Sequence, residues 1–168
     1  PFLNVNYDFS DTALNGKILP HKIFQLDGIK VGVFGVGIEL SGLVPSDLCA
    51  GVRYNDPLST AQRSAYQLKH DHKCDYVVCL SHLGFRYDDN KVSDIALAKS
   101  TNDIDLILSG HTHTFLDKPE IYINKSGQEV MVNQVGWAGI CLGRIDLFFT
   151  ANAKKTMHHY SRIDVVSG

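Results

Sequence analysis

The sequence has no apolar run that approaches the roughly 18 residues a helix needs to cross a bilayer, and it has no excess of basic residues. Lys and Arg number 16 against 18 Asp and Glu, for a formal net charge of −2. We therefore expect no membrane span and no nucleic-acid partner, because nucleic-acid binding needs a basic surface. Cysteine is also scarce: Cys49, Cys74, Cys79 and Cys141 match no zinc-knuckle or CxxC spacing. Cys79 and Cys141 lie in apolar segments and are interpreted as buried free thiols.

The chain has no recognisable linker, internal repeat or low-complexity segment, and it opens with Pro1 rather than Met. Its 168 residues, 44% of them hydrophobic, suffice for one domain with a sizeable core. We therefore interpret residues 1–168 as a single domain or a piece of one.

The middle of the chain alternates strand and helix patterns. Asp56 suits a helix N-cap and Pro57 the first helical position, and Ser93 suits the cap of a second helix. The predicted elements are a strand at 29–38, a helix from 57, a strand at 75–82, a helix at 92–100 and a strand at 103–110. This βαβαβ order predicts an α/β fold with a parallel sheet.

The flanking segments predict antiparallel structure. Alternating residues predict a strand over 2–9, and the turn Asp27-Gly28 predicts a hairpin with the strand that follows it. After the βαβαβ unit, we expect a hairpin over 120–135 and a longer antiparallel pair over 140–166. In the first arm of that pair Cys141, Ile145, Leu147 and Phe149 share one face, which is typical of a half-buried strand.

Histidines follow two of the predicted parallel strands. "CLSH" ends at His82, and "LSGHTH" ends with His111 and His113. Ligands bind beyond the carboxyl ends of strands in open α/β sheets, so we expect the three imidazoles to gather at one edge. In extended backbone, residues two apart point the same way about 6.6 Å apart, which suits ligands of two metals about 3.5–4 Å apart. The alternative is that these histidines are hydrogen-bonded structural residues.

The remaining polar candidates are interpreted as structural. The pair His158-His159 is expected at a surface, and Asp88, Asp89 and Asn90 could reach a metal but are expected in a solvated loop. His21, His70 and His72 are assigned to a turn and to a helix end.

Several phrases carry a family resemblance. "LSHLGF", "SDIALA", "IDLILSGHTHTFLDKP" and "VNQVGWAGICLGRIDL" occur in one order, and over about residues 1–150 the chain resembles the 5′-nucleotidase branch of the calcineurin-like metallophosphoesterases. The resemblance implies a two-sheet sandwich with two divalent ions (Zn, Mn or similar). The resemblance further implies that hydroxide activated by both metals hydrolyses nucleotide or related phosphate esters. By this resemblance His82 and His111 are ligands of one metal and His113 is a ligand of the other.

The sequence departs from the family upstream of these phrases. The motifs DxH, GDxxD and GNH[ED] are absent, so the chain offers no catalytic residue and no bridging carboxylate. We interpret it as the C-terminal portion of a metallophosphoesterase domain, truncated or complemented by a second polypeptide that carries the N-terminal half. Such a portion is expected to hold at most one metal ion, to be inactive alone, and to dimerise or exchange strands.

Two other readings stay open. The chain could be a non-catalytic module that keeps the fold and binds a partner, or a flavodoxin-like binder, which would leave the HxH pattern unexplained. Substrate-binding residues are not predicted; Trp137 and Phe115 could stack on a base, although Trp137 between glycines favours packing.

Overall fold

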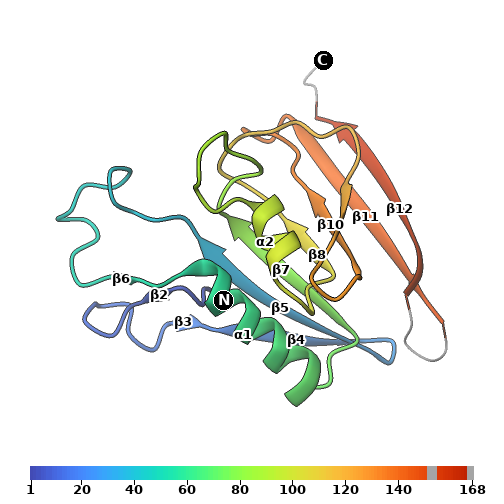
Figure 1. The fold of residues 1–168 in the computed structure, drawn as a ribbon, viewed down its shortest axis with the longest axis horizontal. Helices are drawn as coiled ribbons and strands as arrows, with labels where there is room; N and C mark the ends of the chain where they lie inside the picture. Colours follow the sequence, from blue (N-terminus) through green and yellow to red (C-terminus); the bar gives the residue numbers. More distant parts are fainter. Residues whose placement is uncertain (151–154, 166–168) are drawn as a thin grey trace.

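A six-stranded mixed sheet forms the centre of the computed structural model, which describes residues 1–150 and 155–165 (Figure 1). The strand order is β4-β5-β7-β8-β10-β9. Strands β5, β7, β8 and β10 run parallel, and the edge strands β4 and β9 pair antiparallel. The bounds are β4 His21–Leu26, β5 Ile29–Gly37, β7 Tyr76–His82, β8 Leu106–Leu108, β9 Glu120–Ile123 and β10 Glu129–Asn133.

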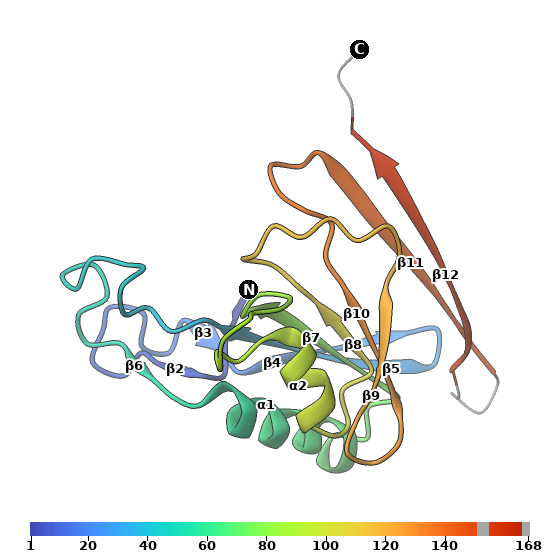
Figure 2. The same ribbon diagram turned by 45° about the horizontal axis from the view of Figure 1, so that its top comes forward.

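The predicted βαβαβ unit is confirmed, with its helical segments on one face of the sheet (Figures 1 and 2). The Asp56 side chain accepts a hydrogen bond from the Ser59 amide at 2.8 Å, and the Ser93 hydroxyl accepts one from the Ala96 amide at 3.2 Å. Both predicted caps are therefore present and satisfy orphan amides of a first helical turn. The segments are α1 Pro57–Tyr66, its π-helical continuation η1 Gln67–Asp71, and α2 Asp94–Ser100.

Each face of the sheet has its own apolar cluster. On the helical face the buried side chains include Phe34, Leu68, Cys79, Leu97 and Ile107. On the other face lies the hairpin of β11 (Cys141–Phe149) and β12 (Lys155–Asp164). Its apolar side chains pack on the sheet as the alternation predicted: Ile145, Leu147 and Phe149 against Tyr76, Val78, Leu106 and Met131.

The hairpin leaves the carboxyl ends of the strands uncovered on its own face. Leu80 of β7 and Leu108 of β8 are register partners there, and they are 42% and 39% exposed. His82, the last residue of β7, lies at this same end of the sheet.

The prediction of one strand over residues 2–9 is wrong. The Asn4 side chain accepts hydrogen bonds from the amides of Asn6 and Tyr7, at 3.0 and 2.7 Å, and this Asx turn breaks the extended run. Two short strands result, each with a different partner. These are β1 Phe2–Leu3, beside β3 Ile18–Leu19, and β2 Tyr7–Asp8, beside β6 Arg53–Tyr54.

The helices and the cysteines bear on two further features of the sequence. Among the residues described, none of the helices is long and apolar enough to cross a membrane. The four cysteines are free thiols, and Cys79 and Cys141 are buried.

Candidate metal centre

His82 is the last residue of β7, at the carboxyl edge of the sheet. In the register it pairs with Gly37 at the end of β5, and its side chain is exposed. A Cβ atom added to Gly110 would lie 2.9 Å from the His82 Nδ1 atom. Glycine at position 110 therefore leaves room for the His82 ring beside the loop.

The loop that carries His111 and His113 is not extended, so the predicted extended geometry is wrong. The φ angle is 72° at His111 and 54° at His113, and both values lie in the left-handed region. For residues other than glycine such conformations cost on the order of 1–3 kcal/mol, and they persist only where the surrounding structure imposes them. The chain therefore turns sharply at each histidine.

The loop nevertheless brings His82 and His111 together. Their ring centroids lie 5.2 Å apart with 71° between the planes. Although His82 is exposed overall, its ring is partly desolvated by its neighbours, and this desolvation lowers its pKa; the charges of His111 and His113 lower the pKa further. A lowered pKa keeps the His82 ring neutral near pH 7, which is the protonation state that binds a metal.

His113 has a different neighbour. Its ring stacks on the indole of Trp137, with centroids 5.5 Å apart and only 14° between the planes. Trp137 is 55% exposed, so it lies at the rim of the site rather than in the core. Phe115 contacts the backbone at Gly136, where a Cβ atom would lie 2.2 Å from its ring.

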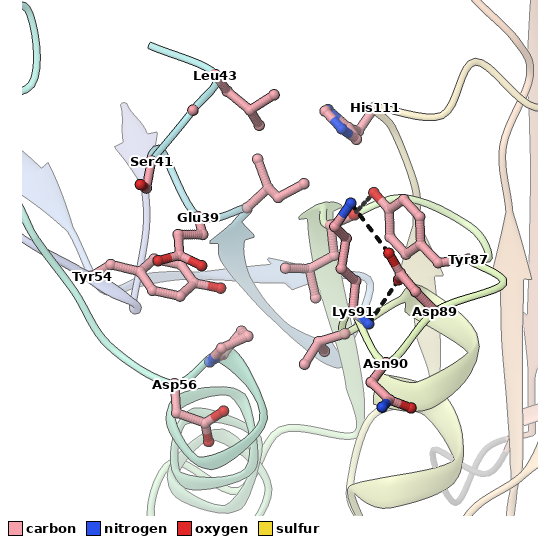
Figure 3. A pocket seen from close by; sticks show the side chains of 15 residues that line it. Glu39, Ser41, Leu43, Tyr54, Asp56, Tyr87, Asp89, Asn90, Lys91 and His111 are labelled. Atoms are coloured by element: carbon pink, nitrogen blue, oxygen red, sulfur yellow. Dashed lines mark hydrogen bonds and ion pairs between the residues drawn. The ribbon is translucent and has the colours of Figure 1, made fainter. Parts of the chain in front are cut away.

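A cavity of about 1060 Å³ opens beside His111 (Figure 3). It is lined by the segment after β5, the start of α1 and the loop after β7. Its charged lining consists of Glu39, Asp56, Asp89 and Lys91, and Lys91 pairs with Asp89 at 3.4 Å. Three acids and one lysine leave a net charge of −2, so the cavity repels anions and favours cations.

The donor set fits part of a metal centre. Neutral imidazole is a good ligand for zinc-like ions, and His82 and His111 are the only pair of predicted ligands in ring contact in the part of the chain described. No three His, Cys, Asp or Glu side chains among residues 1–150 and 155–165 are arranged as a metal site. Metal binding by the three histidines stays a prediction.

Two polar residues near the loop were given no role by the sequence interpretation. Asp94, the first residue of α2, is fully buried and accepts a hydrogen bond from Ser109; Gln134, just after β10, is 2% exposed and bonds to the histidine loop. Gln134 follows an apolar strand directly, as the stretch "VMVNQ" shows. The same pattern at the end of another strand identified His82 as a candidate.

Comparison with known proteins identifies the family. No protein-family model matches the chain. It is 34% identical over 132 residues to the trifunctional nucleotide phosphoesterase YfkN of Bacillus subtilis, a match that covers 79% of this chain and 8% of YfkN. The chain belongs to the 5′-nucleotidase branch of the calcineurin-like metallophosphoesterases. The resemblance seen in the sequence is thereby confirmed.

Solved structures of this family share the fold. The 5′-nucleotidase precursor of Thermus thermophilus superposes with a TM-score of 0.83 at 24% identity, over 96% of this chain and 33% of that one. Calcineurin-like phosphoesterase YfkN from B. subtilis gives 0.71 at 20% identity, over 98% and 55%. The chain thus covers only part of each relative's length, 8% of full-length YfkN, 33% of the T. thermophilus protein and 55% of the solved YfkN structure, which is consistent with a C-terminal portion of the domain.

Proposed function

We propose that this chain supplies the histidine half of a divalent-metal-dependent phosphoesterase centre that hydrolyses nucleotide or related phosphate esters. The observation that carries the proposal is the convergence of His82 and His111 at the carboxyl edge of the sheet, in a chain of this family. The names of the relatives support a phosphate ester as substrate: YfkN is a nucleotide phosphoesterase, and a relative from Vibrio cholerae is a 5′-nucleotidase.

In this proposal His82 and His111 hold one ion, and His113 contributes to the site of a second. A divalent metal supplies positive charge for the phosphoryl oxygens and lowers the pKa of water to near neutrality. The imidazoles hold and orient these ions, and the acidic cavity beside His111 receives the ester only once such charge is present.

The chain by itself is proposed to be inactive. Two divalent cations bring a charge of +4, and neutral imidazoles offset none of it. Within the described residues no third acidic or thiol ligand joins the histidines, so we expect one weakly held ion at most. The missing carboxylates come from the N-terminal half of the domain, in the same polypeptide or in a second one. Residues 1–168 then form a single partial domain.

The first test is titration of the protein with Zn²⁺ in a calorimeter. We expect one bound ion, lost in His82→Ala and in His111→Ala. His159→Ala is the matched control, because the ring of His159 is exposed and lies 3.8 Å from Asp146, away from the site. Equal Zn²⁺ binding by all three variants would remove the basis of the proposal.

The second test is hydrolysis of a nucleoside 5′-monophosphate by the pure chain. We expect none, and activity once the N-terminal half of a relative is added. Hydrolysis by the chain alone that disappears in His111→Ala would contradict the proposed inactivity.

A second candidate function is a non-catalytic module that binds a partner through its sheet. It is favoured by the uncovered leucines at the carboxyl ends of β7 and β8. A coding sequence that continues upstream into DxH and GDxxD supports the phosphoesterase; a partner complex formed without metal and without the histidines supports the module.

A further inference from the structure

Gln134 uses every hydrogen-bonding position of its side chain on the segment that carries the histidines. Its Nε2 atom donates to the Ser109 hydroxyl at 2.6 Å and to the Gly110 carbonyl at 2.7 Å. Its Oε1 atom accepts from the Thr112 hydroxyl at 3.2 Å and from the Thr114 amide. An amide has two donor hydrogens and two acceptor lone pairs, so this side chain is saturated.

These four partners bracket the two histidines in the chain. Ser109 and Gly110 precede His111, Thr112 separates the histidines, and Thr114 follows His113. Both histidines have positive φ angles, which few residues other than glycine adopt. Such backbone persists only where surrounding contacts over-determine it, and Gln134 provides contacts on both sides of each histidine.

The same network reaches the segment that follows β7. The Thr112 hydroxyl accepts from the Phe85 amide at 2.9 Å. The Ser109 hydroxyl donates to the buried Asp94 carboxylate, and the Asp94 amide donates to the Gly84 carbonyl at 2.8 Å. Both histidine-bearing segments are therefore held by one set of partly buried hydrogen bonds that meets at Gln134 and Thr112.

We propose that Gln134 is a positioning residue of the metal centre: it fixes the loop Gly110–Thr114 and thereby the directions in which His111 and His113 present their ring nitrogens. The inference rests on the proposed function, because it takes these histidines to be the ligands. Groups outside the ligand set that orient the ligands influence metal affinity without touching the ion, and their loss typically weakens binding by 10–100-fold; Gln134 acts on this orientation through the loop rather than through the imidazoles.

The test compares Gln134→Met, which keeps the volume and removes all four hydrogen bonds, with Asn124→Ala. Asn124 is the matched control because it is also a buried amide, and its side chain accepts from the amides of Ser126 and Gln128 in the β9–β10 turn. A structural role predicts that both variants lose stability and keep their affinity for Zn²⁺. A positioning role predicts a dissociation constant for Zn²⁺ raised 10–100-fold in Gln134→Met and changed less than twofold in Asn124→Ala.

A metal-free readout separates this inference from the proposed function. Histidine ring signals in NMR spectra of the apo protein should shift or broaden for His111 and His113 in Gln134→Met, and stay unchanged in Asn124→Ala. If the wild type binds no Zn²⁺, the proposed function fails while these spectra still decide the role of Gln134. Unchanged ring signals in a folded Gln134→Met variant overturn the inference.

A second pair of variants covers the case in which Gln134→Met does not fold. Thr112→Val removes the hydroxyl between the histidines, and Thr112→Ser keeps it. We expect Thr112→Val to weaken Zn²⁺ binding by about tenfold. Thr112→Ser should bind Zn²⁺ with an affinity within twofold of that of the wild type. Equal affinities in the two variants would contradict a role for this network in placing the ligands.

Discussion

The imidazole of His113 lies parallel to the indole of Trp137, with 5.5 Å between the ring centroids. The indole is the only one in the chain, and more than half of it is exposed. An exposed aromatic ring stacked on a candidate ligand restricts the motion of that ligand while leaving the edge of its ring accessible.

The stack gives a prediction for a double-mutant cycle. We expect Trp137→Ala and His113→Ala to show a coupling free energy of about 0.5–1.5 kcal/mol in the free energy of unfolding, which is typical of an aromatic pair. Urea unfolding of the two single variants and the double variant measures it. A parallel cycle of Trp137→Ala with His159→Ala should be additive, and additivity in both cycles would show that the stack contributes nothing.

Asp94 gives a prediction about pH. Burial raises the pKa of Asp94 from 3.8 to about 6, against hydrogen bonds from Ser109 and Ser81 that lower it. Since the folded pKa lies above the unfolded one, the folded state binds more protons between these two values, and stability falls as the pH rises from about 4 to 6. A pKa raised from 3.8 to about 6 corresponds to about 3 kcal/mol of stability.

Asp94→Asn removes this titration and keeps an acceptor for Ser109. Its free energy of unfolding should match that of the wild type near pH 4 and exceed it by up to about 3 kcal/mol above pH 6. Urea denaturation of both proteins across this range measures the difference. A difference that does not grow with pH would show that Asp94 titrates normally.

The sequence predicted the sheet and helices well because their signals are local. The Asp56 and Ser93 caps and the apolar run at 29–38 each depend on neighbouring residues alone, and all three are confirmed. The failures come from side-chain hydrogen bonds that compete with regular structure. Asn4 breaks the predicted N-terminal strand through an Asx turn, and no periodicity reports such a bond.

The sequence correctly predicted that His82 and His111 lie close together, but it predicted the wrong backbone conformation for the loop that carries His111 and His113. Strand ends placed His82 near the loop of His111, because parallel strands end at a common edge. The extended HxH geometry was wrong, since the contacts that bend the loop come from Gln134, more than 20 residues downstream. A bond between residues so distant leaves no spacing pattern that a single sequence can show.

Gly110 gives a prediction about steric access. A methyl group at this position would meet the His82 ring, and the flexible ring would turn aside rather than the backbone. We expect Gly110→Ala to weaken Zn²⁺ binding by about tenfold, the lower end of the range for changes that disturb the orientation of a ligand, with a stability loss below about 1 kcal/mol. Gly127→Ala is the control: its φ of +76° with open space around it predicts a loss of about 1–2 kcal/mol from the left-handed backbone and unchanged metal affinity. A normal affinity in Gly110→Ala would show that His82 is not a ligand.

The outer face of the β11–β12 hairpin gives a prediction about self-association. Leu142 and Ile163 are cross-strand partners, and each is more than half exposed. Exposed apolar pairs on a two-stranded sheet favour contact with another surface. We expect sedimentation to show a monomer–dimer equilibrium that depends on concentration and shifts to monomer in Leu142→Lys. Leu19→Lys, at an exposed leucine of β3, should leave the equilibrium unchanged. A monomer at every concentration would contradict self-association through this face.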